Sequence, residues 1–130
     1  DDIIVDLWHK WVLITTVAGA TTLFNATIGE IASTEHGIAF ITDLHDECIT
    51  IAKSEKIKVN DDDLAQQRRF LSDKKSTWSS SMRRDMVNKS KIECAHIFLE
   101  LINIADKNNV ECPSLKTVMI NGEIYMRSLV

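Results

Sequence analysis

Proline and glycine are scarce in this chain of 130 residues, which contains one proline and four glycines. The glycines are isolated from one another, so the sequence has no glycine-rich loop of the kind that cradles phosphate groups. No run of alternating apolar and polar residues is long enough to indicate a strand. We therefore predict an all-α fold, and the length is that of a single domain covering residues 1–130.

Cysteine and clustered positive charge are also scarce, and each shortage excludes a class of protein. Cys48, Cys94 and Cys112 are odd in number and form no C-x-x-C pair, which argues against a disulfide framework and a zinc cluster. We therefore expect a reducing, cytoplasmic setting. The 15 basic residues are scattered and the net charge is −4, which argues against a nucleic-acid partner. The chain starts without Met and without a secretion leader, so we expect a fragment of a longer protein.

Charged residues are absent from Trp11 to Gly29, a stretch nearly long enough to span a bilayer. A membrane span is one interpretation of such a stretch. Five threonines, together with Gly19 and Asn25, dilute its hydrophobicity, however. We therefore favour a central helix that is buried on most sides, and we expect no membrane partner.

Further helices are indicated by caps and by apolar residues at helical spacing. The segment from Thr34 to Glu55 is amphipathic. Turn and N-cap residues from Val59 to Asp63 precede a short helix over Leu64–Leu71. A last helix should start near Pro113 and continue to about Arg127. Between these, an apolar stripe ends at Asn108-Asn109, and its members are Cys94, Ile97, Phe98, Leu101, Ile104 and Ala105.

Lys10 stands at the edge of the uncharged stretch and is the first residue that could carry chemistry. One interpretation is a lysine whose stem lies along apolar surface while its ammonium reaches water. The other is that partial desolvation favours loss of its proton, so that it can protonate a developing alkoxide or polarise a carbonyl. Both interpretations require the same buried helix.

Three consecutive serines, Ser79, Ser80 and Ser81, are suited to capping a helix that begins near Met82. The capping role does not exclude a second one. A serine hydroxyl, together with the free backbone donors of a helix N-terminus, is also suited to binding a carboxylate. The serine run is therefore a candidate anion site as well as a cap.

Glu93 has two structural interpretations of its own. The run from Ser90 to Glu93 matches a capping box, in which the glutamate reaches back to the N-cap amide. Glu93 and His96 also have the spacing of a carboxylate-bridged metal site. Such sites need a second copy of the pair on another helix, and the sequence has none, so we expect no metal.

Taken in order, several segments resemble the C-terminal helical domain of the ketopantoate reductases (2-dehydropantoate 2-reductases), a fold of the 6-phosphogluconate dehydrogenase C-terminal-like type. The run from Leu7 to Lys10 resembles the family's W-x-K entry to a buried helix. The run from Ser80 to Asp85 resembles its S-S-M-x-x-D motif, and Glu93 follows eight residues later, where the family has a glutamate. Asn109 to Pro113 resembles the turn before its last helix.

The resemblance implies a role for each of these residues. Lys10 would be the general acid in reduction, and Ser81 would hold the carboxylate of a 2-oxo acid, with Ser80 as a possible second donor. Glu93 would orient the lysine or bind a substrate hydroxyl. The resemblance also implies a partner, an N-terminal Rossmann domain that supplies NADPH and is absent from this chain, and a possible homodimer. The fragment should be inactive alone because hydride transfer needs both halves.

Three positions depart from the family pattern, because Ile14, Ala18 and Ile28 stand where members usually carry asparagine. Losing amides removes donors that a hydroxyl-bearing substrate needs. The substrate is therefore either ketopantoate, in pantothenate biosynthesis, or a more apolar 2-oxo acid. A further alternative is a non-catalytic helical interaction module. The enzyme interpretation requires Lys10, Ser81 and Glu93 to meet in one cleft, whereas the module interpretation does not.

Overall fold

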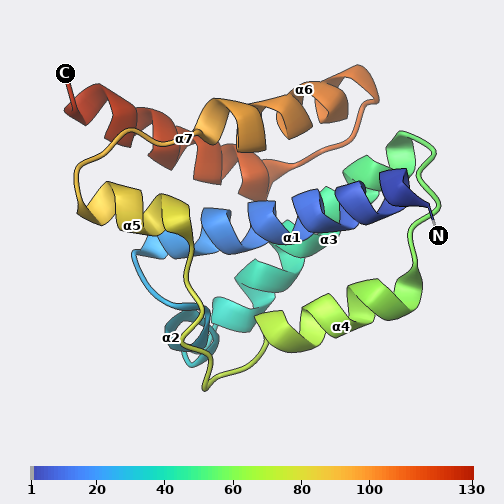
Figure 1. The fold of residues 1–130 in the computed structure, drawn as a ribbon, viewed down its shortest axis with the longest axis horizontal. Coiled ribbons are helices and arrows are strands. Elements are labelled where there is room, and N and C mark those ends of the chain that lie inside the picture. Colours follow the sequence, from blue (N-terminus) through green and yellow to red (C-terminus); the bar gives the residue numbers. More distant parts are fainter. Residues whose placement is uncertain (1) are drawn as a thin grey trace.

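The computed structural model describes residues 2–130, which form an all-α domain (Figure 1). No strand occurs within these residues, so the predicted fold class is confirmed. The helices in chain order are α1 (Ile3–Phe24), α2 (Ile28–Ala32), α3 (Gly37–Ser54), α4 (Asp61–Leu71), α5 (Ser81–Val87), the π-helical turn η1 (Ala95–Leu99), α6 (Glu100–Lys107) and α7 (Pro113–Ser128).

Helix α1 is the centre of the domain. It runs between α4 on one side and α7 on the other (Figure 1), and it also contacts α2, α3, α5 and η1. Every residue from Thr15 to Thr22 is buried. Among residues 2–130, α1 is the one helix long and apolar enough to cross a membrane, but it packs here as a core helix. The prediction of a central buried helix is confirmed.

Buried threonines fit into this core because most of them bond to their own helix. The hydroxyls of Thr16, Thr21 and Thr22 donate to carbonyl oxygens four residues earlier, at 2.9, 2.6 and 2.7 Å. A buried hydroxyl that is bonded in this way avoids most of its desolvation cost. Thr15 is different, because its Oγ1 has no hydrogen-bond partner within residues 2–130.

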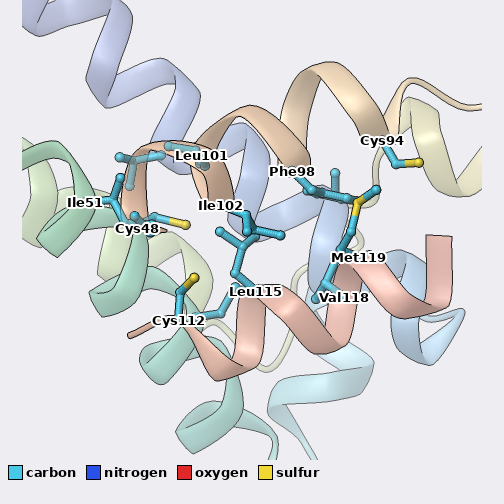
Figure 2. Close-up of a cluster of buried hydrophobic side chains, with 14 of the residues drawn as sticks. Cys48, Ile51, Cys94, Phe98, Leu101, Ile102, Cys112, Leu115, Val118 and Met119 are labelled. Atoms are coloured by element: carbon cyan, nitrogen blue, oxygen red, sulfur yellow. The ribbon is translucent and has the colours of Figure 1, made fainter. Parts of the chain in front are cut away.

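The main hydrophobic core is formed by the two predicted apolar faces, of α3 and of η1–α6, together with a face of α7. Figure 2 shows side chains of α3, of the continuous η1–α6 helix and of α7 pointing toward one another. Phe98, Leu101 and Leu115 are completely buried there. The three cysteines are free and buried, and burial raises the pKa of each thiol.

A second, smaller core lies beneath α2, a short helix that was not predicted from the sequence. Its members are Val17, Ala20, Ile28, Ile31, Ile41 and Leu71. The extended segment from Ser76 to Trp78 runs against α2, where the Gly29 N–H donates to the Ser76 carbonyl at 3.0 Å. A Cβ at Gly29 would lie 2.2 Å from that carbonyl oxygen, so only glycine allows this close approach.

The capping box occurs at Thr27 and Glu30, not at Ser90 and Glu93. The Glu30 N–H donates to the Thr27 hydroxyl at 3.1 Å, and the Thr27 N–H donates to the Glu30 carboxylate at 2.9 Å. This bond from the Thr27 backbone lowers the pKa of Glu30. The prediction at Ser90 is wrong because the Ser90 N–H donates to the Asp85 carbonyl at 2.7 Å, which makes Ser90 part of the end of α5.

Two predicted helix starts are confirmed, and one of them has an unexpected cap. Asn60 caps α4 by accepting the Asp63 N–H at 3.0 Å. Helix α7 begins at Pro113, but its cap comes from another helix. The Glu47 carboxylate of α3 accepts the N–H groups of Ser114 and Leu115, at 3.1 and 3.0 Å.

A buried polar network joins α1, α3 and α4. The Arg68 Nε–H donates to His45 Nδ1 at 3.0 Å, so His45 carries its proton on Nε2 and donates it to the Gln67 side-chain oxygen at 2.9 Å. Gln67 in turn donates to the His9 carbonyl at 3.0 Å. Burial lowers the pKa of His45, which favours the neutral imidazole that this network needs.

Candidate active site

Lys10 lies on the exposed face of α1, beside the π-helical turn η1. It lines an open hollow of about 370 Å³, called here the lysine hollow, with Leu7, Trp11, Ile14, His96, Ile97 and Glu100. The Trp11 ring N–H donates to the Ile97 carbonyl at 3.1 Å, which holds η1 against α1, and both residues line the hollow. Lys10 itself is exposed. The desolvation considered from the sequence is therefore not supplied by this chain.

A second hollow of about 230 Å³ begins one helical turn further along α1. It is called here the serine hollow, because Ser79, Ser80 and Ser81 line it at the start of α5. The remaining lining is apolar and consists of Ile14, Val17, Ala18, Trp78, Met82 and Ile97. Ile14 and Ile97 line both hollows, so the two adjoin. The fold thus brings Lys10 and the serine run to one continuous stretch of surface.

The three serines differ in what their hydroxyls can still do. Ser80 is the N-cap of α5 and accepts the Arg83 N–H at 3.0 Å. Its hydroxyl also lies 2.8 Å from Thr21 Oγ1, whose own hydrogen is donated to the Val17 carbonyl at 2.6 Å. Ser80 must therefore donate to Thr21, and it has no hydrogen left for a ligand.

Ser81, the first residue of α5, keeps a free hydroxyl. It is exposed, and its side chain takes part in none of the hydrogen bonds described within residues 2–130. Ser79 accepts Arg83 Nη1 at 3.2 Å and keeps its own hydrogen to donate. The arrangement thus favours Ser81 over Ser80 and adds Ser79, to which the family resemblance gave no role of its own.

Glu93 lines neither hollow. Its side chain is 78% exposed, and its carboxylate lies 3.6 Å from His96 Nε2. His96 and Glu100 are the polar residues that share the lysine hollow with Lys10. Glu93 therefore reaches that hollow only through His96 in this structure. Within residues 2–130, no group of three or more His, Cys, Asp or Glu side chains is placed to hold a metal ion.

The three positions that depart from the family pattern lie in different places. Ile14 and Ala18 line the serine hollow, so the loss of amides there changes the site directly. Ile28 is completely buried in the second core and lines neither hollow. Only two of the three departures therefore lie at the candidate site.

The all-helical fold matches the C-terminal helical domain of the ketopantoate reductases. The family model "Ketopantoate reductase PanE/ApbA C terminal" matches residues 2–121. The chain belongs to this family, whose members are oxidoreductases.

Relatives and solved structures agree with this assignment. The uncharacterized oxidoreductase YkpB of Bacillus subtilis is 32% identical over 120 residues, which cover 92% of this chain and 40% of that protein. The chain is thus similar to less than half of that relative.

Two solved structures share the fold over nearly the whole chain. A PanE/ApbA family ketopantoate reductase from Ralstonia eutropha JMP134 has a TM-score of 0.88 at 20% identity, covering 99% of this chain and 43% of that one. A D-mandelate dehydrogenase solved with NADH and anilino(oxo)acetate has a TM-score of 0.84 at 19% identity, covering 99% of this chain and 54% of that one.

Proposed function

We propose that this chain is the substrate-binding domain of an NADPH-dependent reductase of 2-oxo acids, with the reduction of 2-dehydropantoate to pantoate as the leading reaction. In that role it would serve pantothenate biosynthesis in the cytoplasm. The observation that supports this most strongly is the placement of Lys10 and Ser81 on adjoining hollows of one helical surface. Membership of the ketopantoate reductase family supports the reaction class.

The coenzyme is assigned to an N-terminal Rossmann domain. This sequence has no glycine-rich loop that could cradle the phosphates of the coenzyme. The chain would therefore contribute residues that bind the substrate, and the other domain would bind the coenzyme. When bound, the coenzyme supplies the hydride. Closure of that domain over the exposed Lys10 would provide the desolvation that this chain lacks.

The two hollows suit the two oxygen-bearing groups of a 2-oxo acid. Ser81, with Ser79 beside it, would donate to the carboxylate. Lys10 lies four residues before Ile14, about 6 Å along the helix axis, and its long side chain can reach across Ile14 toward the 2-oxo group. There it would stabilise the developing alkoxide and donate the proton that completes the reduction.

Glu93 is proposed to act on Lys10 after domain closure, with His96 as the contact between them. The Glu93 carboxylate lies 3.6 Å from His96 Nε2, and His96 lines the lysine hollow. A carboxylate so placed would orient the lysine or accept a hydrogen bond from a substrate hydroxyl.

A more apolar 2-oxo acid is the second candidate substrate. No asparagine or glutamine lines either hollow. The hydroxyl group of ketopantoate would therefore lose partners at Ile14 and Ala18, and such losses discriminate strongly between substrates. The solved D-mandelate dehydrogenase, whose fold matches this chain, carries the apolar 2-oxo acid analogue anilino(oxo)acetate.

The test uses the full-length protein that carries this domain. NADPH oxidation is followed with ketopantoate and with a panel of other 2-oxo acids, for the wild type, Lys10→Ala and the control Lys58→Ala, which alters an exposed lysine outside both hollows. Loss of a general acid should lower kcat by about a hundredfold or more for Lys10→Ala, and the control should behave as wild type. If the wild type reduces no 2-oxo acid, the proposal is wrong and the non-catalytic interaction module becomes the better interpretation.

A further inference from the structure

Trp78 forms one wall of the serine hollow, and its backbone is held on both sides. Its N–H donates to the Ser76 hydroxyl at 3.0 Å, and its carbonyl accepts the Ile28 N–H at 2.9 Å. These bonds fix the residue against α2, three positions before Ser81. The wall and the proposed carboxylate site thus stand on one short, anchored segment.

The indole of Trp78 is also supported from the side. Phe70, near the end of α4, packs edge-to-face against it with the ring centroids 6.4 Å apart and the planes at 79°. Trp78 is 40% exposed and Phe70 is 54% exposed, so neither ring is a core residue. Phe70 does not line the hollow, so its contact with the site runs through Trp78.

The rest of the hollow matches this wall in chemistry. Apart from the serines its lining is apolar, and Ile14, Ala18 and Met82 line it together with Trp78. At about 230 Å³ it is smaller than the pockets of about 300–1,000 Å³ that hold drug-sized ligands, and it suits one small apolar group.

We propose that Trp78 is a specificity-determining residue that receives the side chain of the substrate, and that the substrate is a 2-oxo acid with a branched aliphatic or aromatic side chain. Phe70 is the positioning residue for the indole. This inference rests on the proposed function, since it takes Ser81 as the carboxylate site. With the carboxylate at Ser81, the substituent on the 2-oxo carbon extends along the apolar wall three residues away.

Steady-state kinetics of the full-length protein test the inference. kcat and KM are measured for phenylglyoxylate, 3-methyl-2-oxobutanoate, ketopantoate and pyruvate, the last of which has a side chain too short to use the wall. Trp78→Ala should lower kcat/KM for the first two acids about 10- to 100-fold, mainly through KM, and change it less than about threefold for pyruvate. Trp78→Phe should recover part of the loss.

Replacing Phe70 should affect the same substrates as replacing Trp78, but with smaller changes in KM. Phe70→Ala should raise KM for the two apolar acids about three- to tenfold and leave kcat unchanged, while Phe70→Tyr should restore KM because it keeps the edge-to-face contact. Phe24→Ala is the matched control. Phe24 is 47% exposed and forms an edge-to-face pair with Phe40, away from both hollows, so this variant should leave substrate preference unchanged.

The outcomes separate this inference from the proposed function. If 2-oxo acids are reduced but Trp78→Ala affects pyruvate as strongly as phenylglyoxylate, Trp78 only supports the fold and the inference is wrong, while the function stands. If Trp78→Ala impairs ketopantoate alone, the apolar substrate class is wrong. If the wild type reduces none of the four acids, the proposed function fails and the inference fails with it.

Discussion

Thr15 is the residue whose replacement should most clearly stabilise this domain. Its side chain is completely buried, and Oγ1 has no hydrogen-bond partner within residues 2–130. The adjacent Thr16 is equally buried, but its hydroxyl donates to the Val12 carbonyl at 2.9 Å. The two threonines thus form a matched pair on α1 that differs in one hydrogen bond.

The expected increase in the free energy of unfolding for Thr15→Val is the sum of two contributions. A buried hydroxyl without a partner costs about 1–3 kcal/mol, and the methyl group that replaces it adds about 0.8 kcal/mol of apolar burial. Part of the summed gain in stability is lost because the neighbouring side chains are packed around an oxygen and not a methyl group. We therefore expect Thr15→Val to raise the free energy of unfolding by about 1–2 kcal/mol. Thr16→Val gains the same methyl group but loses a hydrogen bond worth about 1 kcal/mol, so its net change should be near zero or destabilising.

Urea unfolding of the 130-residue chain, followed by tryptophan fluorescence, provides the measurement. The midpoint should rise for Thr15→Val with an unchanged slope, which shows a true change in stability. A thermal scan should show a rise of about 4 °C per kcal/mol for a domain of this size. If Thr15→Val destabilises the chain, or if the two variants shift alike, the assignment of an unsatisfied hydroxyl is wrong.

Two further predictions concern contacts between helices. Because burial lowers the pKa of His45, with Arg68 donating to its ring and Asp46 nearby, the unfolded chain binds a proton that the folded chain resists; the free energy of unfolding should therefore fall as pH drops below about 6.5. Urea titrations at several pH values give the free energy of unfolding as a function of pH. This dependence on pH should be weaker for His45→Asn than for wild type, and an equal dependence would show that His45 is not its source. Replacing the exposed His36 by Gln serves as the control. Glu47→Ala should cost about 1–2 kcal/mol and speed amide exchange at the start of α7, because it removes the carboxylate that accepts two N–H groups there. The exposed Glu111→Ala is its control, and equal effects of the two variants would show that Glu47 is not a cap.

The sequence alone predicted most of the helices and their buried faces. The uncharged stretch after Trp11 is the core of α1, the stripe through Phe98 is buried, and α7 begins at Pro113. These features depend on residues three or four positions apart, whose spacing can be read directly. The same local signals were present for α2, since Thr27 and Glu30 have capping-box spacing, but a helix of five residues has too short an apolar pattern to be noticed.

The sequence named the candidate site residues but not their arrangement. Lys10 and Ser81 were named from motifs that resemble those of the family, with Ser80 as a possible second donor. Only the tertiary structure places Ser80 against Thr21, 59 residues away, where its hydrogen is used. The wall formed by Trp78 and the separation of Glu93 from the lysine hollow likewise had no signal in the local sequence.

The sequence by itself therefore determined which segments become helices, which face of each is buried and which side chains have suitable chemistry. The tertiary structure decided which of those side chains meet. Glu47 caps α7 from 67 positions away, and Trp11 bonds to Ile97 across 86 positions. Contacts of this kind depend on how the helices pack, and a local pattern carries no information about a partner so distant along the chain.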